Sequence, residues 1–188
     1  MSLTPRFAEL NERIDDLHFR FVPPLDPTGT YTDAQYDRMS AFRLLAHAEI
    51  ERFIELLIED ALSRFIANIL AWKTAGCSSQ LVDSPVSHMD KKLRKEVRSN
   101  NGVKSENVLS LLKPVGLNGT HLDNLWLQTM DTYGEIRGGH AHNSRRATQP
   151  IDPKTEQDLI YMQILPELSL TAVMEPPMFG VMEPQTGS

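Results

Sequence analysis

The feature that most constrains this chain is residues 31–75, which contain neither proline nor glycine. Thr32 and Gln35 have the spacing of a capping box at the start of a helix, and Gly76 is a suitable C-terminal stop. The apolar residues recur at helical spacing and form one broad stripe that must be buried against other helices. We therefore predict one very long central helix. Its stripe consists of Ile50, Phe53, Ile54, Leu57, Ile58, Ala61, Leu62, Phe65, Ile66 and Ile69.

Shorter helices are predicted on both sides of the long one. Residues 77–85 are polar and predict a loop, which a short basic helix around Met89–Arg98 follows. Ser105 and Glu106 open another short helix through Leu112. The N-terminal helix starts at Thr4-Pro5, a capping residue followed by proline, and has an apolar face formed by Phe7, Leu10, Ile14 and Leu17.

Two more helices complete the prediction. Thr120 is expected to cap a helix that stops at Gly138-Gly139, because adjacent glycines weaken a helix. Asp152-Pro153 opens the last helix, which Pro166 kinks or ends. The predicted inner faces contain Leu122, Leu125, Trp126, Thr129, Met130 and Tyr133 in the first of these helices, and Leu159, Ile160, Met162 and Ile164 in the second.

These elements predict an all-α fold, an up-and-down helical bundle with one very long central helix. We find no internal repeats and no convincing strand. Residues 1–174 are predicted to form a single domain. Residues 175–188 are rich in proline, methionine and glycine and predict a loose tail.

The composition excludes several classes of protein. The formal net charge is −6, which argues against a protein whose whole surface binds nucleic acid. The single cysteine, Cys77, rules out an internal disulfide and has no sequence context for a nucleophile. No apolar run reaches transmembrane length, and the N-terminus lacks a signal-peptide pattern. We expect a cytoplasmic protein with no membrane segment.

The chemistry of the chain is concentrated in residues 133–146, which contain two of the six histidines and three arginines. Arg137 and His142 have an Arg-x4-His spacing. A guanidinium beside an imidazole can bind a phosphate and move a proton next to it. The spacing alone is weak, since Arg13 and His18 share it. The setting of Arg137 on the inner face of its helix distinguishes it.

Helical geometry leaves the identity of the imidazole open. On an unbroken helix, Arg137 and His142 differ by about 140° around the axis, so His140 would be the better neighbour of Arg137. If the backbone bends at Gly138-Gly139, His142 can swing toward the arginine. His140 otherwise fits a simple role as a cation at a helix end.

Three polar residues fall within the apolar stripe of the long helix. Arg43, His47 and Glu51 stand at i, i+4 and i+8 and need partners, because a buried polar group without one is costly. The ladder can satisfy itself along the helix, and Glu51 can also meet a group opposite. We infer that Glu51 or the ladder orients Arg137. The simpler alternative is an internal polar network or a dimer contact without catalysis.

The sequence predicts no metal and no cofactor. His140 and His142 have no carboxylate or cysteine at the usual ligand spacing. Gly138-Gly139 lacks the lysine and the strand context of a phosphate-binding loop. Residues 86–104 carry six lysines and arginines against two acids, and such a run is more often a solvated helix face than a binding surface.

Two segments resemble the HEPN domains, and most closely the branch called RiboL-PSP-HEPN. One is Leu-Leu-Ala-His-Ala-Glu-Ile-Glu-Arg-Phe-Ile-Glu at residues 44–55; the other is Tyr-Gly-Glu-Ile-Arg-Gly-Gly-His-Ala-His-Asn-Ser at residues 133–144, at the end of a Trp-bearing helix. The similarity covers residues 33–170. HEPN domains are α-helical bundles that often form symmetric dimers, and many are metal-independent endoribonucleases with an Arg-x(4–6)-His motif. The resemblance implies that Arg137 and His142 are the motif pair.

The function implied by this resemblance is cleavage of RNA in a toxin or antiviral-defence role. An imidazole takes the proton of the 2′-hydroxyl, and a guanidinium holds the charge that develops on the phosphate. The implied catalytic residues are Arg137 and His142, with His140 as the alternative base and Glu51 as an orienting acid. A homodimer would bring two such motifs together, and a protein partner could neutralise the enzyme. The candidate RNA-binding residues are Lys91, Lys92, Lys95, Arg145 and Arg146.

A second hypothesis is a non-catalytic HEPN module that binds a partner or acts as an antitoxin-like scaffold. Many active HEPN domains carry Asn, Asp or His directly after the motif arginine, where this chain has Gly138. That departure and the acidic net charge favour the scaffold, whereas Arg137, His142 and Glu51 favour the enzyme. A third reading is a nucleotide-binding helper domain.

Overall fold

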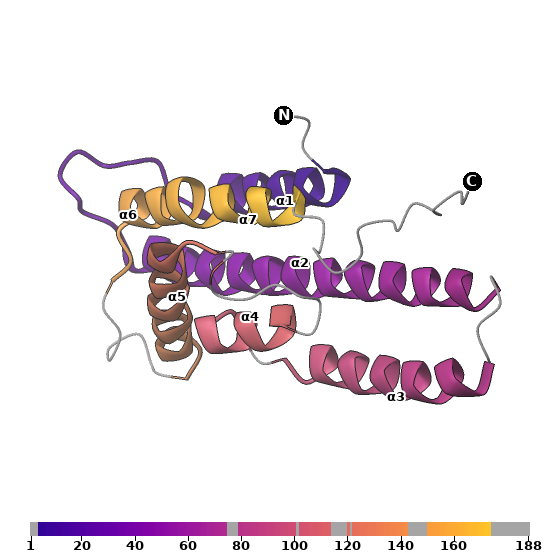
Figure 1. The fold of residues 1–188 in the computed structure, drawn as a ribbon. Coiled ribbons are helices and arrows are strands. Elements are labelled where there is room, and N and C mark those ends of the chain that lie inside the picture. The colour runs from indigo at the N-terminus through magenta and orange to yellow at the C-terminus, as the bar shows by residue number, and fades with distance from the viewer. Residues whose placement is uncertain are drawn as a thin grey trace.

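The long central helix is present in the computed structural model. Helix α2 (Asp33–Thr74) contains 42 residues, and Figure 1 shows it running the length of the molecule. The predicted capping box starts it: the Thr32 hydroxyl accepts from the Gln35 N–H at 3.3 Å, and Gln35 Oε1 accepts from the Thr32 N–H at 2.8 Å. These two bonds satisfy donors that the first helical turn leaves open.

The structure describes residues 4–74, 79–100, 102–113, 120, 122–142 and 150–173. Gly76, Cys77, Arg145, Arg146 and the tail at 175–188 lie outside them. Within the described residues the fold is all-α, without strands, as predicted. None of the helices in this part of the chain combines the length and the apolar character needed to cross a lipid bilayer.

The remaining helices pack around α2 (Figure 1). Ion pairs between Arg6 and Asp60 and between Arg13 and Glu49 show that α1 runs antiparallel to α2. The chain returns along α2 in α3, and the last helices lie beside α1. The bounds are α1 Pro5–Phe21, α3 Ser79–Arg98, α4 Ser105–Leu112, α5 Asn124–His142, α6 Pro153–Asp158, the π-helical segment η3 Leu159–Ile164, and α7 Leu165–Val173.

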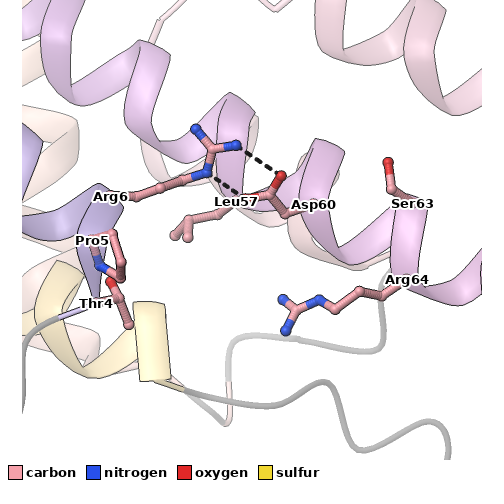
Figure 2. A pocket seen from close by; sticks show the side chains of 7 residues that line it. All are labelled: Thr4, Pro5, Arg6, Leu57, Asp60, Ser63 and Arg64. Atoms are coloured by element: carbon pink, nitrogen blue, oxygen red, sulfur yellow. Dashed lines mark hydrogen bonds and ion pairs between the residues drawn. The ribbon is translucent and has the colours of Figure 1, made fainter.

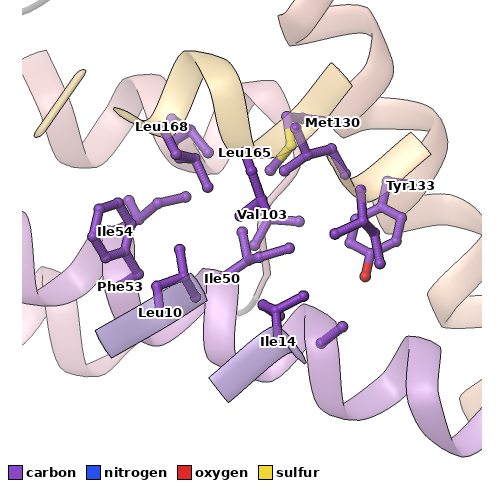
Figure 3. Close-up of a cluster of buried hydrophobic side chains, with 14 of the residues drawn as sticks. Leu10, Ile14, Ile50, Phe53, Ile54, Val103, Met130, Tyr133, Leu165 and Leu168 are labelled. Atoms are coloured by element: carbon purple, nitrogen blue, oxygen red, sulfur yellow. The ribbon is translucent and has the colours of Figure 1, made fainter. Parts of the chain in front are cut away.

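The predicted stripe of α2 supplies one wall of the core, which Figure 3 shows. Its first part is buried, as the helical spacing predicted: Ile50 is fully inaccessible, and Phe53, Ile54, Ile58 and Leu62 are nearly so. Phe65, Ile66 and Ile69, farther along α2, are only partly buried. The opposing walls are formed by Leu10 and Ile14 of α1, Met130 and Tyr133 of α5, and Leu165 and Leu168 of α7.

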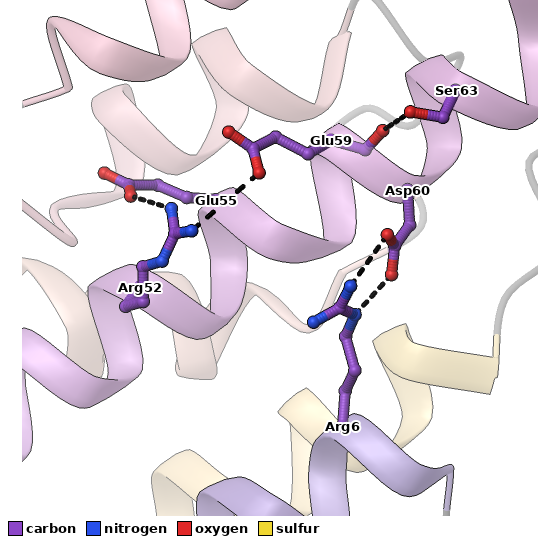
Figure 4. A network of polar contacts seen from close by, with 6 residues as sticks. All are labelled: Arg6, Arg52, Glu55, Glu59, Asp60 and Ser63. Atoms are coloured by element: carbon purple, nitrogen blue, oxygen red, sulfur yellow. Dashed lines mark hydrogen bonds and ion pairs between the residues drawn. The ribbon is translucent and has the colours of Figure 1, made fainter.

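Charged residues of α2 lie outside this apolar stripe. Arg52 pairs with Glu55 at 3.1 Å and lies 3.9 Å from Glu59, and Arg6 reaches across from α1 to hold Asp60 (Figure 4). These side chains are all partly or largely exposed. Exposed pairs of this kind contribute about 0–1 kcal/mol each, so burial of the stripe does more to stabilise α2.

Several predicted boundaries and inner-face residues are wrong. Residues 79–85 belong to α3, whereas we predicted a loop up to Pro85. Helix α5 begins at Asn124, not after Thr120; its cap is Asp123, whose carboxylate accepts from the Trp126 N–H at 2.8 Å. Leu125 and Met162, predicted to face inward, are 71% and 72% exposed. Leu125 stands on the first turn of α5, directly before buried Trp126, and Met162 lies in the π-helical segment, where the 3.6-residue spacing used for the prediction does not apply.

Pro166 does not end the last helix, which continues to Val173. The π-helical segment Leu159–Ile164 directly precedes it, and the Leu165 N–H bonds to the carbonyl of Ile160, five residues back. Proline lacks an N–H, and its ring clashes with the carbonyl four residues earlier in a regular α-helix. The wider π turn accommodates this proline without breaking the helix.

Candidate functional site

The centre of the candidate site is the contact between His47 of α2 and Tyr133 of α5. Both side chains are buried, and their rings stack with centroids 5.6 Å apart and an interplanar angle of 29°. His47 Nδ1 lies 3.8 Å from a carboxylate oxygen of Glu51, one turn along α2. His47 and Glu51 are therefore neighbours along α2, as their i, i+4 spacing predicted, and the pair faces α5.

Glu51 also reaches the segment between α3 and α4. Its Oε1 accepts from Asn100 Nδ2 at 3.1 Å. Two residues later, Gly102 turns the chain with φ of +134°, a conformation that favours glycine. A Cβ at Gly102 would lie 3.9 Å from Cε1 of His47. The Glu51 carboxylate thus lies between the His47 imidazole and the loop after α3, so α2, α5 and this loop meet at one point.

Arg43 does not take part in this ladder. It is buried and pairs with the fully buried Glu156 of α6, through Nε at 2.9 Å and through a second bond from Nη2. The hydroxyl of Tyr133 donates to the main-chain carbonyl of Arg43 at 3.3 Å. Arg43 is therefore satisfied by Glu156 of α6, and not by its neighbours along α2, which was one of the predicted alternatives. The Glu156 carboxylate forms a two-pronged pair with the buried guanidinium.

Because the hydroxyl of Tyr133 is buried, we predict that the protein loses stability at alkaline pH. Burial, and then the nearby Glu156 carboxylate, raise the pKa of Tyr133 well above its usual 10.0. Partial burial and a hydrogen bond to Asp15 also raise the pKa of Tyr161. Only the unfolded chain then releases these protons near pH 10, so this contribution to stability is complete below pH 10 and is lost as the pH rises above it.

Urea unfolding of wild type and Tyr133→Phe at about pH 8 and pH 11 tests this prediction. The variant should lose about 1 kcal/mol at pH 8 through the missing hydrogen bond. It should lose less additional stability than wild type between the two pH values. An equal additional loss in both proteins would contradict the buried, protonated hydroxyl.

The motif residues lie on the last turns of α5. The backbone there is helical through His142, so the helix passes Gly138-Gly139 without the predicted stop. The side chains of residues 136–142 lie outside the described ones. At 100° per residue, Tyr133, Arg137 and His140 fall within about 60° of one another, and His142 stands about 140° from Arg137. An unbroken α5 therefore makes His140, the alternative base, the closer helical neighbour of Arg137.

The candidate RNA-binding lysines of α3 are exposed. Lys91, Lys92 and Lys95 all face solvent, and Lys92 Nζ lies 4.0 Å from Glu96. They lie on the helix that ends at Arg98, shortly before Asn100 and its bond to Glu51. The basic helix therefore leads to the His47–Glu51 junction, although these three side chains make no described contact with it.

A surface cavity lies elsewhere, between the start of α1 and the middle of α2 (Figure 2). Its volume is about 490 Å³, and its lining residues are Thr4, Pro5, Arg6, Leu57, Asp60, Ser63 and Arg64. Asp60 stands 13 positions after His47, about 20 Å along α2. The two-pronged pair of Arg6 with Asp60 neutralises one of the two arginines in the cavity. The cavity and the candidate site are thus separate features.

The sequence prediction missed Glu156 and Asn100. Glu156 had a usable signal: it precedes Ile160 by one helical turn and so falls on the buried face of its helix, which is unusual for an acid without a partner. Asn100 carried no such signal, because its role depends on how the loop after α3 approaches α2. Among the described residues, no three His, Cys, Asp or Glu side chains are grouped so as to hold a metal ion.

Comparison of the chain with protein-family models, with curated proteins and with solved structures returned no match.

Proposed function

We propose that this protein is a metal-independent endoribonuclease of the HEPN type, which acts in the cytosol in a toxin or defence role. Arg137 binds the scissile phosphate, and His140 or His142 transfers the proton. The observation that carries the proposal is the packing of buried His47 of α2, with partly buried Glu51 beside it, against Tyr133 of α5. Arg137 follows one turn after Tyr133, on the same side of α5.

This packing supports the proposal because it supplies the environment that the reaction needs. His47 is removed from solvent at 1% exposure, and the Glu51 side chain is partly buried at 18% exposure. Charges act more strongly in such surroundings than in water. A carboxylate held beside an imidazole, and next to the helix that bears Arg137, can orient the guanidinium toward a phosphate.

The proposed reaction uses the nucleophile that RNA carries. An imidazole removes the proton of the 2′-hydroxyl, and the 2′-oxygen forms a bond to the adjacent phosphorus. The bond from phosphorus to the 5′-oxygen breaks, and that oxygen takes a proton from a second imidazole. The products are a 2′,3′-cyclic phosphate and a 5′-hydroxyl, and Arg137 holds the negative charge that builds up on the phosphate in between.

The second imidazole is proposed to come from a second copy of the chain. A two-fold dimer that apposed two α5 helices would place two arginines and two histidines at one cleft, one motif pair from each copy. A protein partner that covered this cleft would neutralise the activity.

Incubation of purified protein with mixed RNAs in EDTA tests the proposal. We expect cleavage to products with 2′,3′-cyclic phosphate ends, unchanged by the chelator because no step uses a metal. Arg137→Lys should be severely impaired, since an ammonium lacks the planar two-pronged grip of a guanidinium on phosphate. Arg64→Lys, in the separate cavity between α1 and α2, serves as the matched control and should cleave like wild type. If folded wild type cleaves none of the RNAs, the result would favour the non-catalytic scaffold.

A further inference from the structure

We propose that Lys104, at the start of α4, is a phosphate-binding residue that guides an RNA strand along α5, and that Gly134 holds it in place. The inference rests on the proposed ribonuclease function and adds to it a substrate-positioning residue outside the Arg137 motif. It follows from how closely the Lys104 side chain crosses α5.

Gly134 is the point of closest approach between α5 and Lys104. A Cβ at residue 134 would lie 2.8 Å from Lys104 Cγ and 3.7 Å from its Cε and its backbone nitrogen. A separation of 2.8 Å is too short for two carbon atoms. The lysine stem therefore lies directly over the glycine, in space that any other residue at position 134 would occupy.

Asp131 of α5 holds the residue after Lys104, so the backbone of Lys104 cannot easily move away from α5. Asp131, one turn before Gly134 on α5, accepts from both the N–H and the hydroxyl of Ser105, each at 2.8 Å. These bonds cap the start of α4 with a carboxylate from α5. A side chain added at residue 134 would therefore displace the lysine stem rather than the loop.

The lysine is accessible and directed at the outer side of α5. Its side chain is 47% exposed, and Nζ lies 3.5 Å from Glu135 Oε1, which is itself 70% exposed. The backbone of α5 continues past Glu135 through Gly138 and Gly139 to His142. The ammonium thus stands on the outer side of α5, shortly before the motif residues along the helix.

Glu135 holds the lysine in the absence of RNA and competes with phosphate for it. An exposed ion pair contributes about 0–1 kcal/mol, so a phosphate can displace the carboxylate. The glutamate charge also repels an RNA strand directly. The two members of the pair must then have opposite effects on RNA affinity, which a purely structural pair would not show.

Binding of a 2′-O-methylated RNA of mixed sequence tests the inference, because this probe lacks the nucleophile and cannot be cleaved. Fluorescence anisotropy over a range of salt concentrations gives both the affinity and its salt dependence. Lys104→Gln should weaken binding about threefold to fivefold and reduce the slope of log K against log salt by about 0.7, the value of one phosphate contact on a single strand. Glu135→Gln should strengthen binding.

Gly134→Ala tests the geometry without removing a charge. It should weaken binding as Lys104→Gln does, because the new methyl group displaces the lysine stem. Alanine is the better helix former by about 1 kcal/mol, so α5 should remain folded, which a thermal melt checks. Lys154→Gln is the matched control: this exposed lysine pairs with Asp158 on α6, and its loss should leave the salt slope unchanged.

The outcomes separate this inference from the proposed function. If wild type neither binds the probe nor cleaves RNA, both are overturned. If wild type binds and cleaves, but Lys104→Gln and Gly134→Ala keep its affinity and salt slope, this inference alone is overturned. The same holds if Glu135→Gln weakens binding. Should Gly134→Ala fail to fold, the opposite effects of Lys104→Gln and Glu135→Gln still decide the question.

Discussion

Replacing the proposed catalytic imidazole on α5 should lower the rate of RNA cleavage by about 10²–10⁴-fold, because the 2′-hydroxyl would lose the group that takes its proton. Two variants identify that group. His142→Ala tests the residue that the Arg-x4-His motif implies, and His140→Ala tests the residue that an unbroken α5 places nearer to Arg137. We expect one variant to abolish cleavage and the other to have a smaller effect.

Single-turnover cleavage rates measure this effect, and thermal melts check that both variants fold. His88→Ala is a suitable control, since His88 is an exposed histidine on α3. Large losses in both α5 variants would indicate that one histidine serves as base and the other as acid. Full activity in both would contradict the proposed site and move the chemistry elsewhere.

Glu156→Ala should destabilise the protein by about 3–5 kcal/mol, because it leaves the guanidinium of Arg43 buried without its partner. Both side chains are almost completely removed from solvent, at 7% and 0% exposure. For a chain of this length, the loss corresponds to a fall in Tm of about 6–20 °C. Chemical denaturation and thermal melts of the variant measure it.

Asp60→Ala provides the matched control, because Arg6 and Asp60 form the same two-pronged pair between helices but are 36% and 42% exposed. Its loss should cost only about 0–1 kcal/mol. Combining Arg43→Met with Glu156→Leu should restore much of the stability, since an apolar pair removes both buried charges. A cost for Glu156→Ala no larger than that for Asp60→Ala would contradict a buried ion pair.

Local rules predicted the elements whose causes are local. The start of α1 at Thr4-Pro5, the Thr32–Gln35 capping box and the full extent of α4 each depend on residues within one helical turn. The same holds for the buried stripe of α2 from Ile50 to Leu62, because the order of apolar and charged residues already defines one face.

The candidate site was predictable only in its parts. His47 and Glu51 stood out because two polar groups lay on an apolar face, and the structure places them against the helix that carries Arg137. The glycine pair, however, predicted a helix end that is absent: α5 continues to His142. The penalty of about 1 kcal/mol for each glycine is a local preference that the packing of a helix readily overrides.

The sequence by itself determined that this protein is all-α, that α2 is its scaffold, and that two histidines and three arginines are concentrated in residues 133–146. Only the tertiary structure decided which partners the charged side chains of the α2 ladder take. Arg43 pairs with Glu156, which is 113 residues away, and Glu51 pairs with Asn100, which is 49 residues away. Helical spacing predicts contacts within one helix but carries no information on which helix lies opposite. That choice follows from packing all the apolar faces into one core.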